Sequence, residues 1–267
     1  MTSLVHRNAG LRFAVSEIGE GRPIIFQHGL CGDASQVADV FPADSGWCST
    51  TLECRGHGKS EAGAPAHFSI STFAADVASL IEARGLPPIV IGGISMGAVI
   101  ALRLAVLRPE LVSALVLARP AWFYETAPAN MQPNAVVGEL LRRFPPDQAR
   151  ARFEASELAR RLEEEAPDNL ASLRGFFSRE PISITRELLC RISADGPGVS
   201  RDGIGSISVP ALIIGHKRDL VHPLSIAQAH AALIPRANLV EITAKADSRE
   251  RYCDDFRQAL TEFLKGL

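Results

Sequence analysis

The stretch Ile89-Val-Ile-Gly-Gly-Ile94-Ser95-Met96-Gly97 decides how this chain can fold. Its first part, 89–94, is a short apolar run typical of a buried parallel strand. The residues that follow, 96–107, are rich in Ala, Leu, Ile and Val and predict a mostly buried helix. Ser95 therefore stands on a tight turn between a strand and a helix, within the pattern G-x-S-x-G.

The glycines of this pattern have a steric reason. A serine on such a turn adopts strained backbone angles, and side chains two residues to either side would collide. The turn holds the hydroxyl above the sheet edge at a helix N-terminus, whose N–H groups favour negative charge. These features indicate a nucleophilic serine. The alternative is a structural glycine-rich turn with an incidental serine, and the strand–helix context argues against it.

A second loop supplies the other half of a candidate site. The apolar run 23–28 is followed by His28-Gly29-Leu30-Cys31-Gly32. An oxyanion hole requires two backbone N–H groups directed at a developing negative oxygen. We expect one from Met96, directly after the serine, and the other from Leu30. For this loop taken alone, the alternative is an ordinary strand-to-helix turn.

Strands and helices alternate along most of the chain. Further strands are expected at 11–18, 49–54, 111–118, 209–215 and 238–243, and further helices at 71–84, 225–233 and 249–264. This alternation predicts an α/β fold with a mostly parallel sheet and helices on both faces. Residues 121–204 show no clear strand. We expect them to form a helical cap, with one helix at 151–165, between two core segments, 1–120 and 205–267.

Composition excludes several classes of protein. The 267 residues are 46% hydrophobic and 22% charged, which excludes a disordered or fibrous chain. The net charge of −2 predicts no basic face, so we expect no nucleic-acid partner. No signal peptide or membrane span is visible, and the five Cys match neither a disulfide framework nor a metal site. We therefore expect a cytoplasmic protein that acts on a small molecule without cofactor or metal; its oligomeric state stays open.

The chain resembles the α/β-hydrolase superfamily. The residues that carry the resemblance are His28-Gly29, Arg55-Gly56-His57-Gly58-Lys59-Ser60, Gly93–Gly97, and the segment from Val209-Pro-Ala-Leu-Ile-Ile-Gly215 through Asp219 to His222-Pro223. Together they span nearly the whole chain, and 121–200 matches the variable cap. The resemblance implies the fold but no particular substrate. We call the strand–helix turn at Ser95 the nucleophile elbow. A serine there argues against the dehalogenase and epoxide hydrolase branches, which resemble each other in using aspartate at this position.

The resemblance also implies an acid and a base. Asp219, just after a strand, matches the acid that orients an imidazole, although a helix-capping or surface aspartate is the alternative. The base of the family is a histidine after the last strand, expected here near Ala246 or Asp247. No histidine follows His230. The usual triad is therefore in question.

Four explanations stay open. His222, three residues after Asp219, is one candidate base, although similar stretches occur in relatives that keep the usual histidine. Lys245 or Asp247 is another, unless both are solvated loop residues. Alternatively, a reactive ester or lactone needs only oxyanion stabilisation. In the fourth explanation, the protein binds a small ligand without turnover.

Other side chains are candidates for substrate contact. His28, Trp122 and Phe123 are predicted to touch substrate, although His28 can instead brace the oxyanion loop and the aromatic residues can pack between cap and core. Arg55 and Arg119 could meet an anionic group, but salt bridges are the expected role. The other histidines are 57, expected to be structural, and 6, 67, 216 and 230, expected on the surface or on helices.

These features predict hydrolysis of a small carboxylic ester or lactone. Ser95, Asp219 and His222 are the predicted catalytic residues, and the N–H groups of Leu30 and Met96 form the predicted oxyanion hole. The alternatives are an inactive ligand-binding protein and a carbon–carbon hydrolase or lyase on the same scaffold.

Overall fold

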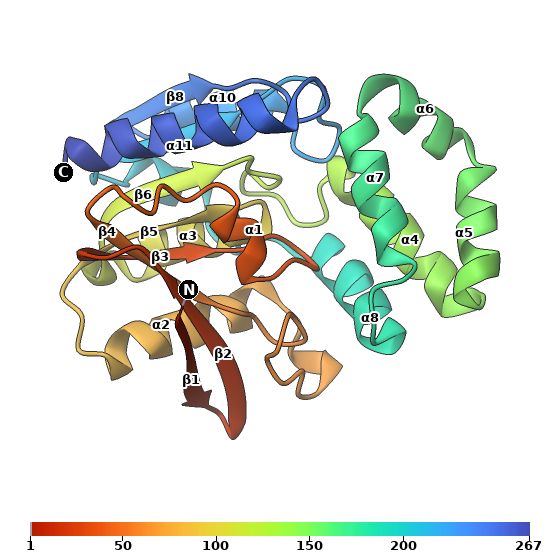
Figure 1. Ribbon diagram of the computed structural model, residues 1–267, viewed down its shortest axis with the longest axis horizontal. Coiled ribbons are helices and arrows are strands. Elements are labelled where there is room, and N and C mark those ends of the chain that lie inside the picture. Colours follow the sequence, from red (N-terminus) through yellow and green to blue (C-terminus); the bar gives the residue numbers. More distant parts are fainter. Residues whose placement is uncertain (1) are drawn as a thin grey trace.

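The core of the protein is an eight-stranded sheet in the order β1-β2-β4-β3-β5-β6-β7-β8 (Figure 1). A computed structural model describes residues 2–267. The strands are β1 (Thr2–Asn8), β2 (Leu11–Ile18), β3 (Arg22–Gln27), β4 (Trp47–Leu52), β5 (Ile89–Ile94), β6 (Val112–Ala118), β7 (Ala211–Gly215) and β8 (Ala237–Glu241). Each of the six strands β4, β3, β5, β6, β7 and β8 is parallel to its neighbour in this series. Strand β2 pairs antiparallel with both β1 and β4. The predicted fold class is confirmed.

Strand β1 was not expected from the sequence. It is an edge strand, paired with β2 alone, and its apolar residues Leu4 and Val5 are 40% and 65% exposed. Because this strand buries little apolar surface, it shows none of the apolar pattern by which the other strands are recognised.

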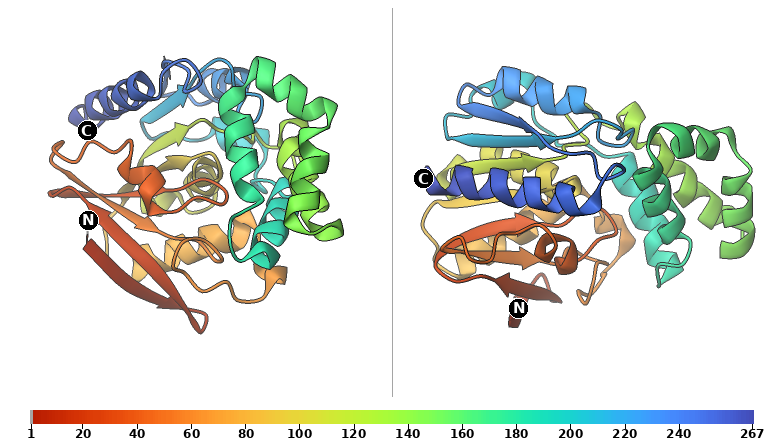
Figure 2. Two further views of the ribbon diagram at one scale, coloured as in Figure 1. Left: turned by 45° about the vertical axis from the view of Figure 1, so that its right-hand side comes forward. Right: turned by 45° about the horizontal axis from the view of Figure 1, so that its top comes forward.

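Helices cover both faces of the sheet. The helices α2 (Ile70–Ala83), α3 (Met96–Leu107), α9 (Arg201–Gly205) and α10 (Leu224–Leu233) share one hydrophobic cluster with the sheet, and α1 (Ala34–Ala38) and α11 (Arg249–Lys265) share another. Short 3₁₀ turns lie at η1 (Pro65–His67) and η2 (Pro109–Leu111). None of the helices in residues 2–267 has the length and apolar character needed to cross a membrane. The carboxyl ends of the parallel strands point towards a group of helices inserted between β6 and β7 (Figure 2).

The segment between β6 and β7 is a helical insertion beside the carboxyl ends of the parallel strands, which we call the cap (Figures 1 and 2). It contains η3 (Ala129–Met131), α4 (Gln132–Arg143), α5 (Pro146–Glu154), α6 (Glu157–Glu165), α7 (Pro167–Phe176) and α8 (Ile182–Ser193). These helices bury a hydrophobic cluster of their own.

The prediction of one helix at 151–165 is wrong. Helix α5 ends at Glu154. Ser156 caps the next helix, α6, by accepting a hydrogen bond from the Ala159 N–H at 3.1 Å. Serine is a strongly preferred N-cap residue, and this N-cap starts a second helix despite the continuous helical pattern of the sequence.

A buried ion pair ties α2 to the loop after β4. Arg55 Nε and Nη2 donate to the two carboxylate oxygens of Asp76 at 2.7 and 2.8 Å, and both side chains are at most 8% exposed. Asp76→Ala leaves the guanidinium buried without its partner. We expect this change to lower the free energy of unfolding by about 3–5 kcal/mol. Urea denaturation measures it, and a loss below about 1 kcal/mol would show that water compensates the charge.

Candidate active site

The elbow predicted at Ser95 is present. Ser95 lies between β5 and α3 with φ 56° and ψ −109°, a conformation that L-residues rarely adopt. A Cβ atom at Gly93 would lie 2.7 Å from the carbonyl oxygen of Gln27, and one at Gly97 would collide with the same atom. The two glycines of the motif are thus required by close backbone packing, and the strained serine is held by its surroundings.

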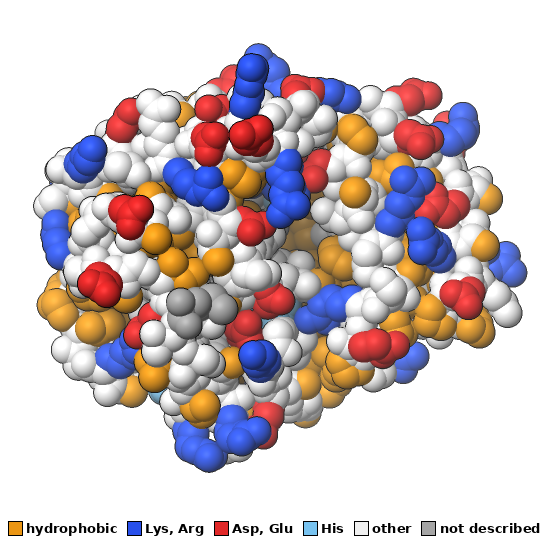
Figure 3. Space-filling view, in the orientation of Figure 1, with side chains coloured by type: hydrophobic (Ala, Val, Ile, Leu, Met, Phe, Trp, Pro, Cys, Tyr) orange, Lys and Arg blue, Asp and Glu red, His pale blue; other side chains and the backbone are white. Residues whose placement is uncertain are grey.

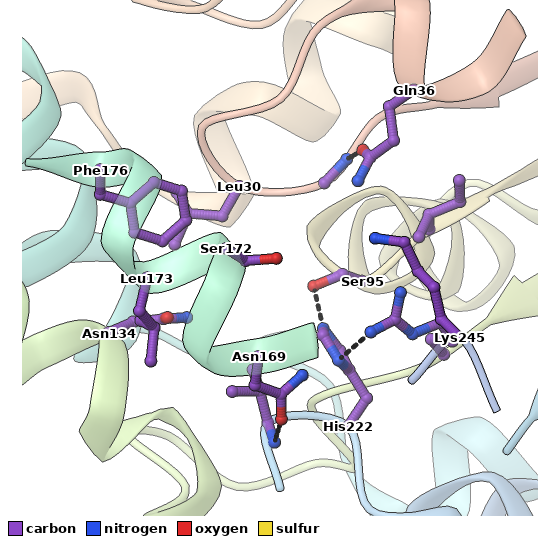
Figure 4. Close-up of a pocket in the computed structure, with 14 residues that line it drawn as sticks. Leu30, Gln36, Ser95, Asn134, Asn169, Ser172, Leu173, Phe176, His222 and Lys245 are labelled. Atoms are coloured by element: carbon purple, nitrogen blue, oxygen red, sulfur yellow. Dashed lines mark hydrogen bonds between the residues drawn. The ribbon is translucent and has the colours of Figure 1, made fainter. Parts of the chain in front are cut away.

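Ser95, His222 and Asp219 form a connected chain of hydrogen bonds, of which Figure 4 shows the bond between Ser95 and His222. The distance from Ser95 Oγ to His222 Nε2 is 2.8 Å, and His222 Nδ1 lies 3.0 Å from both carboxylate oxygens of Asp219. The acid and the imidazole come from one short loop after β7. The structure therefore brings the three predicted catalytic side chains together without a histidine after β8.

The hydrogen bonds assign the tautomer of His222. A carboxylate only accepts, so Nδ1 carries the proton towards Asp219, and Nε2 accepts from the Ser95 hydroxyl. Burial lowers the pKa of His222 below its usual value, partly opposed by the charge of Asp219 and reinforced by that of Arg119. The imidazole is therefore neutral near pH 7, as a base that takes a proton must be.

Arg119 holds the acid in its ionised form. Its Nε and Nη2 donate to Asp219 Oδ2 at 3.0 and 2.6 Å. Burial alone would raise the pKa of Asp219, but the charge of Arg119 and the contacts with His222 hold it well below its usual value. Arg119 Nη2 is also 3.3 Å from His222 Nδ1, where the imidazole proton already points to Asp219. The guanidinium is a fixed structural charge in this site, in agreement with the expected salt bridge.

The loop after β3, where half of an oxyanion hole is predicted, lies beside Ser95. Leu30 lines the same cavity as Ser95, and Met96 opens α3. Gln36 Oε1 accepts the Gly29 N–H at 2.6 Å and so fixes the start of the loop. The N–H groups of Leu30 and Met96 have no protein acceptor within residues 2–267. Unpaired N–H groups at these two positions are what the predicted oxyanion hole requires.

The other two candidate bases are engaged elsewhere. Lys245 Nζ pairs with Asp168 Oδ1 of the cap at 2.9 Å, and Lys245 lines the cavity. Asp247 forms an exposed ion pair with Arg218. Neither side chain makes a hydrogen bond to Ser95 within the described part of the chain, whereas His222 does.

The cavity beside Ser95 has a volume of about 90 Å³ and lies between core and cap. The space-filling view shows the surface hollowed between these two parts (Figure 3). The cap contributes residues that sequence analysis did not identify: Asn134, Asn169, Ser172, Leu173 and Phe176. Four of them lie on α7 at the spacing of one helix face, so a helical pattern at 169–176 was the available signal. In residues 2–267, no cluster of three or more His, Cys, Asp or Glu could hold a metal ion.

Three predicted substrate contacts need correction. His28 is fully buried, where Nε2 accepts the Cys54 N–H at 3.0 Å and Nδ1 donates to the Gly29 carbonyl. Trp122 is 1% exposed and Phe123 packs edge-on against His230. None of the three lines the cavity that holds Ser95. His28 braces the oxyanion loop, and the aromatic residues pack cap against core.

His216 is neither on the surface nor on a helix. It directly follows β7 and is 2% exposed, with Nε2 at 3.6 Å from Asp219 Oδ2. His230 lies on a helix, α10, as expected, and is fully buried there, where it donates to the Trp122 carbonyl at 2.9 Å. His57 is structural as expected, since its Nε2 accepts the Cys31 N–H at 2.9 Å.

Comparison with known proteins places this geometry in a family. The family model described as "alpha/beta hydrolase fold" matches residues 22–246. The chain is 30% identical over 246 residues to "Putative non-heme bromoperoxidase BpoC" of Mycobacterium tuberculosis, covering 87% of this chain and 89% of that protein. It is 29% identical over 230 residues to "Putative carbamate hydrolase RutD" of Klebsiella pneumoniae, covering 83% of each.

Solved structures share the fold. The crystal structure of BpoC superposes with a TM-score of 0.70 at 25% identity, covering 95% of this chain and 96% of that one. The enol-lactonase from Burkholderia xenovorans superposes with a TM-score of 0.73 at 23% identity, covering 98% of this chain and all of that one. With the family model matching most of the sequence, the chain belongs to the α/β-hydrolase fold family.

Proposed function

We propose that this protein hydrolyses a small carboxylic ester or lactone, with Ser95 as nucleophile, His222 as general base and Asp219 as the supporting acid. The observation that carries the proposal is the 2.8 Å hydrogen bond from Ser95 Oγ to His222 Nε2. A serine hydroxyl becomes an effective nucleophile when an adjacent base takes its proton. The cavity of about 90 Å³ favours a small substrate, and an activated serine favours a carbonyl compound such as an ester or lactone.

The proposed reaction uses groups already in place. Ser95 Oγ attacks the carbonyl carbon while its proton passes to His222 Nε2, and Asp219 stabilises the imidazolium. The N–H groups of Leu30 and Met96 bind the oxygen that becomes negative. The intermediate then expels the alcohol, which takes the proton from His222. Water, activated by the same imidazole, hydrolyses the acyl-serine and restores the site.

Ser95→Ala tests the proposal. We expect native protein to hydrolyse members of a panel of activated esters and lactones and Ser95→Ala to lose about 10⁴-fold or more in kcat, because only the oxyanion hole and binding remain. A fluorophosphonate probe should label the native protein and not the variant. Ser113→Ala, an exposed serine on β6, is the matched control. Equal turnover by native protein and Ser95→Ala would refute a serine mechanism, and no turnover or labelling would favour the ligand-binding alternative.

A further inference from the structure

The loop that carries both Asp219 and His222 is held by the cap. The two residues between them, Leu220 and Val221, donate their backbone N–H groups to Oδ1 of Asn169 at 2.8 and 3.1 Å. Asn169 lies in the first turn of α7 and is 3% exposed. Buried N–H groups outside regular structure need such an acceptor, because leaving them unpaired is costly. A cap side chain therefore satisfies the polar backbone of the catalytic loop.

A second asparagine of the cap, Asn130, also binds the backbone of this loop. Nδ2 of Asn130, in η3 of the cap, donates to the Val221 carbonyl at 2.7 Å and to the Ala121 carbonyl at 2.8 Å. Val221 thus has its N–H held by Asn169 and its carbonyl held by Asn130. The direction of the two contacts is opposite, since Asn169 serves as an acceptor and Asn130 as a donor.

The residue before Asn169 extends the contact to the acid. Asp168 lies 3.6 Å from Arg119 Nη2 and 2.9 Å from Lys245 Nζ, and Arg119 in turn holds the Asp219 carboxylate. The first turn of α7 consequently meets both the backbone of the catalytic loop and the charge that orients its acid.

We propose that Asn169 and Asn130 are positioning residues that hold the loop where His222 reaches Ser95, so that the cap takes part in assembling the base. This inference rests on the proposed serine mechanism. Because the base stands on an irregular loop, small movements of that loop displace Nε2 from the Ser95 hydroxyl. A displacement of about 1 Å is enough to lower a rate by about 100-fold.

The same substitution at the two positions separates positioning from a general effect. Asn169→Asp keeps an acceptor for both N–H groups, and we expect kcat within about tenfold of native. Asn130→Asp removes the donor and sets a carboxylate against two carbonyls, and we expect kcat to fall about 100-fold with KM within about threefold. Asn169→Leu, which lacks the acceptor, should lose about as much as Asn130→Asp.

The pH profile adds a readout that loss of stability would not move. His222 is surrounded by the charges of Asp219, Arg119 and Asp168 and by the imidazole of His216. Asn169→Asp adds a negative charge beside them, which raises the pKa of His222. The acid limb of kcat/KM should therefore move to higher pH in Asn169→Asp.

Asn8→Leu is the control for Asn169→Leu. Asn8 donates one hydrogen bond to Asp76 at 2.9 Å on β1, at the opposite edge from β8. We expect native kcat in this variant. Hydrogen exchange of the peptide containing Leu220 and Val221 should quicken in Asn169→Leu and stay native in Asn8→Leu.

Unchanged kcat in Asn169→Leu, or equal losses in the two Asp variants, would overturn the inference while leaving the serine mechanism standing. Absence of labelling and turnover in native protein would overturn both.

Discussion

His222→Ala is expected to lower kcat/KM for ester hydrolysis by about 10⁴-fold or more and to slow fluorophosphonate labelling of Ser95 comparably. His222 Nε2 lies 2.8 Å from Ser95 Oγ, and its pKa is lowered by burial, so it is neutral and ready to accept a proton. The rate with a fixed panel of activated esters, measured at pH 7.5, checks the expectation.

Lys245→Met gives the contrasting result. The ammonium pairs with Asp168 at 2.9 Å, so it already has a partner other than Ser95. We expect this variant to retain the labelling rate of Ser95 within about tenfold. A large loss in Lys245→Met together with near-native labelling in His222→Ala would identify lysine as the base and refute the triad proposed here. Circular dichroism of both variants controls for misfolding.

Acidification between pH 6.5 and 4 is expected to unfold the protein. Burial lowers the pKa of His230 to about 4, and it also lowers those of His28, His57, His216 and His222. These groups are neutral when folded, whereas in the unfolded chain they bind protons near pH 6.5. The free energy of unfolding is therefore not reduced by these histidines above about pH 6.5. It falls as the pH drops from there towards their pKa values in the folded protein. His230 alone accounts for about 3 kcal/mol by pH 4.

Urea denaturation at pH 8, 6 and 4.5 measures this loss. His230→Gln keeps a donor for the Trp122 carbonyl but does not titrate in this range, so its stability should depend less steeply on pH. A native protein as stable at pH 4.5 as at pH 8 would contradict the expectation, because it would mean that these imidazoles are protonated or hydrated in the fold.

Local patterns were sufficient to predict the elbow and the parallel core. The steric demands of Gly93 and Gly97 act within a few residues of Ser95, and the apolar runs of the central strands reflect burial on both faces. Each of these signals is contained in a short window of sequence. Short stretches of the same kind also predict the N–H groups of Leu30 and Met96 as oxyanion-hole donors. Each donor is placed by its own loop and needs no distant residue to be recognised.

The base could not be singled out in the same way. That His222 reaches Ser95 depends on the path of a loop, and Asn169, which we propose to hold that path, lies on the cap 52 positions from Val221. Trp122 and Phe123 posed a similar problem, since an aromatic residue after a strand end can face either a cavity or a packed interior. Three-dimensional packing, and no feature of the local sequence, decides both questions.

The joint placement of acid and base on one loop has a consequence for how such a site can be inherited. Asp219 and His222 are three positions apart, and the His222 N–H itself bonds to Asp219 Oδ1 at 2.9 Å. Acid and base are therefore inherited together in one short segment, but that segment keeps its place only where Asn169, Asn130 and Arg119 are also present. With the proposed base on this loop, the segment after β8 need not supply a histidine, and it contributes Lys245 to the cavity instead.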